Sequence, residues 1–278
     1  MIVVSAATGE FGRLVVEGLL ERVPASTVAV AVRNPGKAED WAAAGVEVRQ
    51  ADYDDPASLR AAFAGADRLL FVSAPITEGP TSRVDQHRNV VAAACDAGVK
   101  RILYTSGLGA DMVEDGVLGE HHATEEMIVE SGLAYTLLRH PIYNDYLIHP
   151  GLQSAVDTGE LTSNTRGRGL NMASRADLAE AAAILLIGTD HDQNAYNFTG
   201  QLWTYPELAQ VLSELSGRHV EYREVDEDQG IIGMLGLAPF IQAGAFELQT
   251  PDLDNVLGHP STSLHEAVPK ALATALTP

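Results

Sequence analysis

The chain has 278 residues, of which 46% are hydrophobic and 20% are charged, the composition of a globular protein with room for one large domain or a domain and a lobe. Its 38 Asp and Glu residues outnumber its 18 Lys and Arg residues, and the formal net charge is −20. Such a surface repels nucleic acid and anionic membranes, so we exclude both as partners.

The single cysteine, Cys95, rules out a disulfide within the chain and favours a cytoplasmic location. We expect this thiol to be buried on a helix and to have a structural role. The first residues already have the pattern of a strand and not of a leader, and no apolar run is long enough to cross a membrane.

The first 22 residues predict a strand, a loop of small residues and a helix. Residues 2–4 are an apolar run, residues 5–9 are small, and apolar residues recur at helical spacing over residues 11–22. The start of a helix that follows such a loop offers backbone N–H groups and a positive dipole end to a pyrophosphate. The unit therefore predicts a dinucleotide site.

The loop departs from the dinucleotide-binding fingerprint in two ways. The fingerprint has three glycines, whereas this loop has Gly9 and Gly12 but Ala6 at the first position. Glu10 places an acidic side chain in a loop that is meant for phosphates. A plain strand-to-helix turn without a ligand therefore stays an alternative for this loop taken alone.

Arg33 favours NADP over NAD as the cofactor. It follows the second predicted strand, 27–32, close to the ~20 residues past the glycines at which a ribose-reading residue is expected. An acidic residue there would bind the ribose 2′-hydroxyl, but a guanidinium group suits a 2′-phosphate. Lys37 is a candidate second cation.

Strands and helices alternate through the first half of the chain. Further strands are predicted at residues 46–50, 68–72, 101–105 and 135–139, and helices at residues 37–44, from 56, 84–97 and 121–130. This order predicts an α/β fold, a Rossmann-like doubly wound parallel sheet, with ligands beyond the carboxyl ends of the strands. Five of the candidate positions fall at that edge: Gly9, Arg33, Asp52, Ser73 and Thr105.

The pattern changes after residue 150, where the elements are shorter. Helices are expected at residues 151–158, 175–187, 205–216 and in the apolar stretch 230–244, and strands at residues 196–200 and 219–225. We expect residues 1–149 to form an NAD(P)-binding domain, with its sheet completed by later segments such as 193–200. Residues 150–278 are then mainly a small α/β C-terminal lobe that binds the substrate.

Several short motifs together resemble one family. They are residues 7–12 (ATGEFG), 32–35 (VRNP), 49–53 (RQADY), 86–90 (QHRNV), 97–100 (AGVK), 104–106 (YTS), 135–139 (YTLLR), 175–179 (RADLA), 203–209 (WTYPELA) and 258–260 (GHP). In this combination the chain resembles the NmrA-like atypical short-chain dehydrogenase/reductases, and within them the branch of NAD(P)H:quinone oxidoreductase type 2 and triphenylmethane reductase. The resemblance covers nearly the whole chain.

The resemblance implies NADPH as the cofactor and a planar conjugated acceptor, a quinone or a related dye, between the two lobes. Together with Asp52, whose place at the sheet edge suits the adenine, the expected cofactor contacts are Thr8, Gly9, Glu10, Phe11, Gly12, Arg33, Ser73, Ala74, Pro75, Thr105, Ser106, His140 and Tyr143. Family members usually carry glycine at the position of Ala6 and commonly asparagine at that of His140. We also expect a homodimer.

The chain lacks the Tyr-x-x-x-Lys pair with which ordinary short-chain dehydrogenases protonate an alkoxide, since none of its three lysines, Lys37, Lys100 and Lys270, follows a tyrosine at that spacing. Hydride transfer to a quinone needs less help, because the product charge is delocalised. Tyr143 and His121 are the candidate proton donors, although His121 also suits a helix-start histidine that pairs with a carboxylate. No metal site is predicted, because the H-E-x-x-H spacing is absent.

Two other functions stay open at this point. A redox-sensing regulator of the NmrA type would bind NADP and do little chemistry, which the missing catalytic pair allows. A fold that has lost the cofactor is the third possibility, for which Ala6 and Glu10 are the argument.

Overall fold

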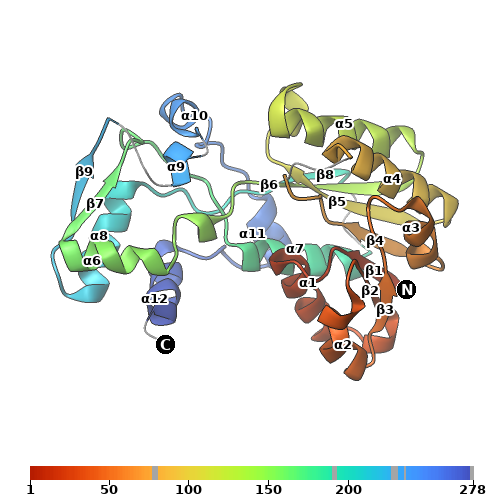
Figure 1. Cartoon of the computed structure of the whole chain (residues 1–278). Helices are drawn as coiled ribbons and strands as arrows, with labels where there is room; N and C mark the ends of the chain where they lie inside the picture. Colours follow the sequence, from red (N-terminus) through yellow and green to blue (C-terminus); the bar gives the residue numbers. More distant parts are fainter. Residues whose placement is uncertain (77–80, 190–192, 227–230, 235, 276–278) are drawn as a thin grey trace. The chain divides into compact units, whose positions relative to one another are not determined.

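The computed structural model describes residues 1–278 except 77–80, 190–192, 227–230, 235 and 276–278 (Figure 1). The chain divides into two compact units. Unit 1 contains Met1–His140 and Leu178–Phe198, and unit 2 contains Pro141–Asp177 and Thr199–Pro278.

Unit 1 is built on a parallel sheet, as predicted. Among the described residues seven strands join in the order β3-β2-β1-β4-β5-β6-β8. Their bounds are β1 Ile2–Ser5, β2 Val28–Val32, β3 Glu47–Gln50, β4 Arg68–Phe71, β5 Arg101–Gly107, β6 Ala134–His140 and β8 Ala195–Asn197. The order reverses between β1 and β4, and this switch point is where open α/β sheets bind ligands. The Rossmann-like fold is confirmed.

Helices cover both faces of this sheet (Figure 1). In chain order they are α1 Glu10–Leu20, α2 Glu39–Ala43, α3 Pro56–Phe63, α4 Arg83–Asp96, α5 Gly116–Glu130 and α7 Arg175–Ile187, with short 3₁₀ turns at η1 Ala25–Thr27, η2 Pro35–Ala38 and η3 Ala110–Met112. Helices α3, α4 and α5 pack on one face through a core that includes Phe63, Phe71, Tyr104 and Ile128, all fully buried. Burial of such side chains contributes about 1.5–3 kcal/mol each.

The start of α3 follows from a local signal. Asp55 caps α3 by accepting the N–H groups of Ala57 and Ser58, and Pro56 occupies the first helical position. Helix α5 begins at Gly116, five residues before the predicted start at His121.

Cys95 is exposed, so the prediction of a buried thiol is wrong. The buried stripe of α4 passes through His87, Val90, Val91, Ala93 and Ala94. Cys95 is one residue beyond Ala94, about 100° around the helix, and this turn takes it out of the core.

Unit 2 is a small α/β lobe. It has two parallel strands, β7 Glu160–Ser163 and β9 Glu221–Glu224. Its helices are α6 Gln153–Thr158, α8 Tyr205–Ser216, α9 Ile231–Met234, α10 Ala238–Gln242, α11 Asp252–Leu257 and α12 Leu264–Ala275, with turns η4 Asn144–Tyr146 and η5 Pro150–Leu152. Of the expected apolar stretch 230–244, residues 230 and 235 lie outside the described residues. No helix within the described ranges is both long and apolar enough to cross a membrane.

Candidate functional site

The turn between β1 and α1 is tightly closed. The backbone N–H of Gly9 donates to the carbonyl oxygen of Ala6 at 3.0 Å, and Ala6 has a φ of 48°. A Cβ at Gly12 would lie 2.8 Å from that same oxygen, a distance that backbone atoms do not tolerate. Gly9 and Glu10 are exposed and Thr8 is half-buried. The turn therefore has the close packing that an approaching pyrophosphate requires.

The rings of His140 and Phe198 pack under Phe11 in the first turn of α1. Phe11 contacts His140 edge-on with ring centroids 5.2 Å apart, and His140 stacks on Phe198 at 5.9 Å. Burial lowers the pKa of His140 to about 3, so the imidazole is neutral near pH 7. His140 is thus one of the side chains on which the glycine turn rests, at the end of β6.

Arg33 and Asp52 follow β2 and β3 at the same edge of the sheet. Strands β1 and β2 are paired through Ser5 and Ala31, so Arg33 leaves the sheet beside the glycine turn. The Arg33 side chain is exposed and forms no hydrogen bond or ion pair with any residue that the structure describes. Asp52 accepts the backbone N–H of Asp54 at 3.1 Å, which fixes the turn after β3.

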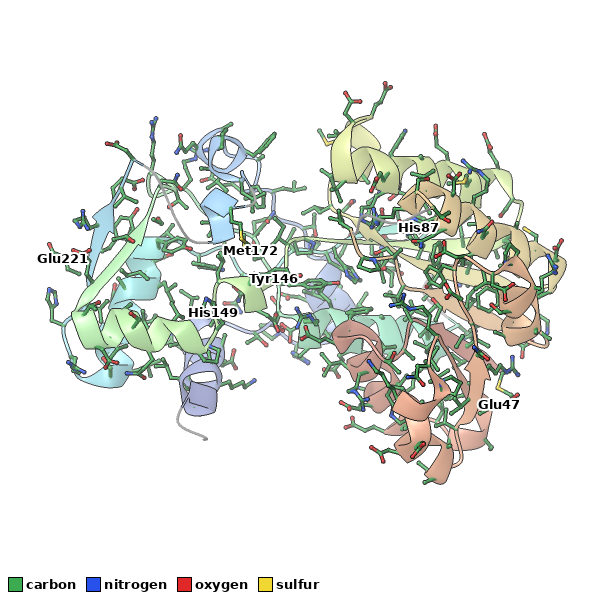
Figure 2. The ribbon with its side chains drawn as sticks, in the orientation of Figure 1. Glu47, His87, Tyr146, His149, Met172 and Glu221 are labelled. Carbon is green, nitrogen blue, oxygen red and sulfur yellow. The ribbon has the colours of Figure 1, made fainter. Side chains whose placement is uncertain are left out.

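The residues after β4 are held by side chains of β5 and α4. The N–H of Ser73 donates to Thr105 Oγ1 at 2.8 Å, and the N–H of Ala74 donates to Nε2 of His87 at 2.9 Å. Figure 2 labels His87 among the helices of unit 1. His87 thus bonds to the backbone of the loop after β4. Pro75, which follows, is exposed and has no N–H to satisfy.

Ser106 belongs to a buried charged network. Its hydroxyl donates to Glu125 at 2.5 Å, and Arg139 binds both oxygens of Glu125, through Nε at 3.0 Å and Nη2 at 2.7 Å. Asp111 also accepts from Arg139, at 2.6 Å. The carboxylates raise the pKa of Arg139 still further, and this pairing locks the ends of β5 and β6 together.

His121 is enclosed by protein groups. Its Nε2 lies 3.0 Å from a guanidinium nitrogen of Arg83, and its Nδ1 lies 2.8 Å from the hydroxyl of Tyr104. Because guanidinium only donates, Nε2 accepts and the proton is on Nδ1. Burial and the neighbouring charge of Arg83 lower the pKa of His121 to about 3. Its role as a proton donor stays a prediction.

Arg83 and Glu120 were not predicted from the sequence. Arg83 opens α4 and is buried, and its Nη1 pairs with Glu120 of α5 at 3.0 Å. The available signal was an arginine at the first position of a helix, which is more often a solvent-exposed place. Only the packing of α4 against α5 shows that this arginine points inward.

Tyr143, the other candidate proton donor, belongs to unit 2. Its ring stacks on Tyr146 with centroids 6.1 Å apart, and the guanidinium of Arg175 lies 5.1 Å from its centroid. Burial raises the pKa of Tyr143, so its hydroxyl keeps its proton at neutral pH. Figure 2 labels Tyr146 in this unit, together with His149 and Met172.

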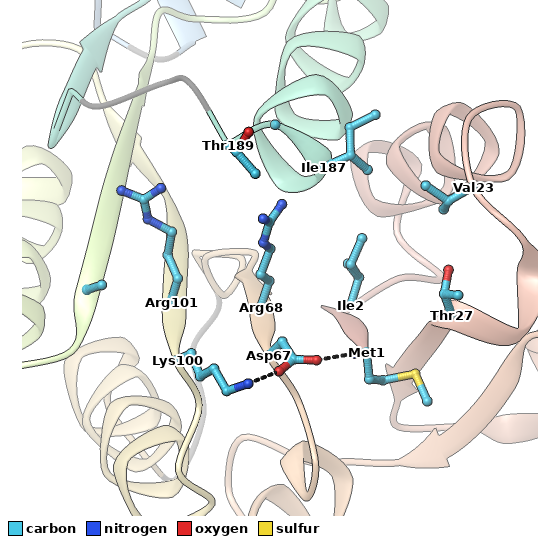
Figure 3. A pocket seen from close by; sticks show the side chains of 12 residues that line it. Met1, Ile2, Val23, Thr27, Asp67, Arg68, Lys100, Arg101, Ile187 and Thr189 are labelled. Carbon is cyan, nitrogen blue, oxygen red and sulfur yellow. Dashed lines mark hydrogen bonds and ion pairs between the residues drawn. The ribbon is translucent and has the colours of Figure 1, made fainter.

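A separate cavity of about 690 Å³ opens at the amino ends of the strands, away from all these residues (Figure 3). The amine of Met1 and the amine of Lys100 both bind Asp67 there, each at 2.5 Å, and Arg68 donates to the carbonyl of Leu186. The two ion pairs connect the starts of β1, β4 and β5, and the bond from Arg68 connects β4 to the end of α7. Across the described ranges, no group of three or more His, Cys, Asp or Glu side chains is arranged to hold a metal ion.

Residues 6–187 match the model of a family described as NAD(P)H-binding. The chain belongs to this family. It is 37% identical to Quinone oxidoreductase 2 of Escherichia coli, over 96% of this chain and 97% of the relative. An NmrA-like family domain-containing oxidoreductase of Aspergillus flavus is 34% identical over 81% of this chain and 75% of its own length. The resemblance to the NmrA-like reductases is confirmed.

A solved structure gives the same result. The Citrobacter sp. triphenylmethane reductase complexed with NADP(H) is 38% identical, covers 98% of this chain and 100% of its own, and superposes with a TM-score of 0.87. The glycine turn, the switch point beside β1 and the exposed Arg33 are therefore features of a chain whose family binds NAD(P)H.

Proposed function

We propose that this protein is an NADPH-dependent reductase that transfers hydride to a quinone or a similar conjugated acceptor. One observation carries the proposal: the closed glycine turn and the exposed Arg33 leave the paired strands β1 and β2 at one edge of the sheet. A pyrophosphate at the turn and a 2′-phosphate at Arg33 are the two anionic parts of NADPH. The family and its named reductases support the same conclusion.

The cofactor would be held by residues at the carboxyl edge of the sheet. They are Thr8, Gly9, Glu10, Phe11, Gly12, Arg33, Asp52, Ser73, Ala74, Pro75, Thr105, Ser106 and His140. The turn fits this role, because a Cβ at Gly9 would make only an ordinary contact, 3.4 Å from the Ala6 oxygen, whereas a Cβ at Gly12 would clash with that oxygen at 2.8 Å. Glu10 is exposed, so its carboxylate can stay in solvent while its backbone faces the phosphates.

When bound, the cofactor supplies a hydride. The chain then has to orient the acceptor and deliver a proton. Because no Tyr-x-x-x-Lys pair is present, another residue has to donate that proton. Tyr143 is the donor that we favour, because a tyrosine hydroxyl is protonated at neutral pH and the positive charge of Arg175, 5.1 Å from the ring centroid, favours the phenolate that is left when the proton goes. Reduction of a quinone delocalises the added charge, so a weak acid is sufficient.

Calorimetric titration with NADPH, NADP and NADH tests the cofactor assignment first. We expect the phosphorylated forms to bind more tightly than NADH, by about tenfold or more, because only they engage Arg33. No binding of any of the three would overturn the proposal. A screen of quinones and triphenylmethane or azo dyes with NADPH then identifies the acceptor, and binding without turnover of any of them would point to a cofactor-sensing role.

We further infer a cytoplasmic protein that forms a homodimer. The single exposed cysteine supports a reducing compartment, where a free surface thiol is stable. Light scattering coupled to size-exclusion chromatography measures the mass of the assembly, and a monomer at every concentration would contradict the dimer.

A further inference from the structure

The backbone of Ala74 is held through both its N–H and its carbonyl oxygen by side chains of α4. Its N–H donates to Nε2 of His87 at 2.9 Å, and its carbonyl oxygen accepts from Nε of Arg83 at 2.7 Å. His87 is fully buried and Arg83 is 8% exposed. The N–H and the carbonyl oxygen of Ala74, which belong to two consecutive peptide groups, therefore both depend on these two side chains.

A second layer from α5 fixes His87. Because Nε2 accepts from Ala74, the proton of the neutral ring is on Nδ1, which donates to Thr124 Oγ1 at 2.8 Å. The hydroxyl of Thr124 in turn donates a hydrogen bond to the carbonyl oxygen of Glu120 at 2.7 Å. The threonine hydroxyl thus sets the tautomer that leaves Nε2 free to accept from the loop.

The same helix fixes Arg83. Glu120 accepts from Nη1 and His121 accepts from Nη2, both at 3.0 Å. His121 in turn donates to the hydroxyl of Tyr104 on β5 at 2.8 Å. Three different groups therefore occupy the three nitrogens of the guanidinium, and only one of them, Glu120, carries an opposing charge.

This layered arrangement lies at the switch point of the sheet. Strand β4 is the neighbour of β1, and Ser5 at the end of β1 accepts the N–H of Val72 at 3.1 Å. Ala74 is therefore only two residues past Val72, which is bonded directly to β1, the strand that leads into the glycine turn. Burying the charge of an arginine costs several kcal/mol. A surface loop without a function does not require a buried arginine to hold it.

We propose that Arg83 and His87 are positioning residues that fix the Ala74 peptide so that residues 73–75 present a rigid surface to the dinucleotide. His121 and Thr124 act behind them, one on each side chain. The proposal rests on the proposed function, since it assigns these residues to the same cofactor site. It gives His121 a role in holding Arg83 that does not require it to donate a proton.

Paired variants separate positioning from simple stability. His87→Leu removes the acceptor for Ala74, whereas His87→Gln keeps an oxygen that can accept the same N–H. Thr124→Val removes the acceptor for His87 and is a milder change if His87→Leu does not fold, and Thr124→Ser restores the hydroxyl. Arg83, His87, His121 and Thr124 together are called the clamp. Ile128→Ala is the control, because Ile128 is fully buried in α5, the helix of Thr124, and does not belong to the clamp.

The measurement is the Kd for NADPH by calorimetry, with the KM and kcat for reduction of 1,4-naphthoquinone, at a temperature about 20 °C below the Tm of every variant. We expect His87→Leu to raise the Kd and KM for NADPH by about tenfold or more and Thr124→Val by about three- to tenfold, with His87→Gln and Thr124→Ser within about threefold of the natural chain. The change in kcat should be smaller. Ile128→Ala should lose thermal stability and keep its Kd.

His121→Gln adds a direct comparison of the two roles of that residue. Its amide oxygen can still accept from Arg83 but cannot deliver a titrating proton. We expect the KM for NADPH to rise less than in His87→Leu and the pH profile of kcat to keep its shape, and a collapse of kcat would show that His121 is the donor instead. Unchanged NADPH binding in His87→Leu and Thr124→Val, or equal weakening in Ile128→Ala, would overturn the clamp alone. No NADPH binding by the natural chain would overturn the proposed function and the clamp together.

Discussion

Gly9 donates its backbone N–H to the carbonyl oxygen of Ala6 at 3.0 Å, and Ala6 makes this bond from a left-handed conformation, with a φ of 48°. Side chains with a Cβ pay for this conformation with about 1 kcal/mol of strain, whereas glycine adopts it freely. The chain has thus kept the shape of a glycine turn while it has an alanine in the first position. The missing glycine is a cost in stability and not a change of geometry.

Ala6→Gly should therefore stabilise the protein by about 1 kcal/mol and leave NADPH binding intact or tighter. Ala7→Gly is the matched control, because Ala7 is fully buried and is not in the left-handed region, so its replacement should destabilise. Urea unfolding of both variants measures the difference. A loss of stability in Ala6→Gly would contradict the strain, and creation of binding that the natural chain lacks would show that Ala6 had closed the site.

Gly12→Ala should destabilise the turn and abolish cofactor binding. Its Cβ would lie 2.8 Å from both the Ala6 oxygen and the Cα of Ala7, and neither backbone atom can move away cheaply. We expect a loss of about 1–3 kcal/mol in the free energy of unfolding. Gly18→Ala is the control in the same helix. Its Cβ would lie 3.4 Å from the Cβ of Ala183, an ordinary contact, and alanine has a higher helix propensity than glycine. Equal losses in the two variants would contradict the close approach.

Arg33→Ala should raise the KM for NADPH by about 10- to 100-fold and leave that for NADH nearly unchanged. The side chain is exposed and has no ion-pair partner among the residues that the structure describes, so stability should not change. Arg60→Ala removes another exposed arginine, one that lies 3.8 Å from Asp96, and should change neither KM. Equal effects of Arg33→Ala on both nucleotides would remove the assignment to the 2′-phosphate.

Glu125→Gln should cost about 3 kcal/mol of stability. It leaves the Arg139 guanidinium, whose side chain is 11% exposed, with only Asp111 as an opposing charge. Glu126→Gln is the neighbouring control: that side chain is 63% exposed and lies 3.6 Å from His122, so its loss should cost less than about 0.5 kcal/mol. Chemical denaturation compares the two. Similar small losses would mean that the buried pair contributes little.

The sheet and its ligand edge could be predicted because their signals are local. Short apolar runs mark the strands, and the carboxyl ends of parallel strands must meet at one edge, so Arg33 and Thr105 fall beside the glycine turn. The strand β7 was missed, because only Leu161 and Ser163 are buried in it and it has no apolar run. Helices α11 and α12 were missed as well.

The support of the site could not be predicted, because it depends on contacts between distant segments. Arg83 and His121 are 38 positions apart, and nothing in the sequence indicates that they share a hydrogen bond. The apolar neighbours of Cys95 predict a buried position, but one further residue around α4 exposes this thiol. Position on a helix face is sensitive to a single residue, whereas the end of a buried strand is not.

His140 should make the protein sensitive to acid. Burial lowers its pKa from 6.5 to about 3, so between these values the unfolded chain binds a proton that the folded chain does not. Stability is then complete above the unfolded value and is lost as the pH falls from about 6.5 towards 3, by about 2 kcal/mol at roughly pH 5 from this one residue.

His140→Asn should remove this share of the acid sensitivity. Burial also lowers the pKa of His87 and of His121, but both residues are present in the variant and in the natural chain. The difference in acid sensitivity between the two proteins therefore reports His140. We expect the variant to lose about 2 kcal/mol less than the natural chain between about pH 7.5 and pH 5, measured by urea unfolding without cofactor. His265→Asn, whose side chain is 62% exposed, should leave the loss nearly as it is in the natural chain. Parallel curves for His140→Asn and the natural chain would mean that His140 is protonated in the folded protein, and the ring contacts with Phe11 and Phe198 would then surround an imidazolium.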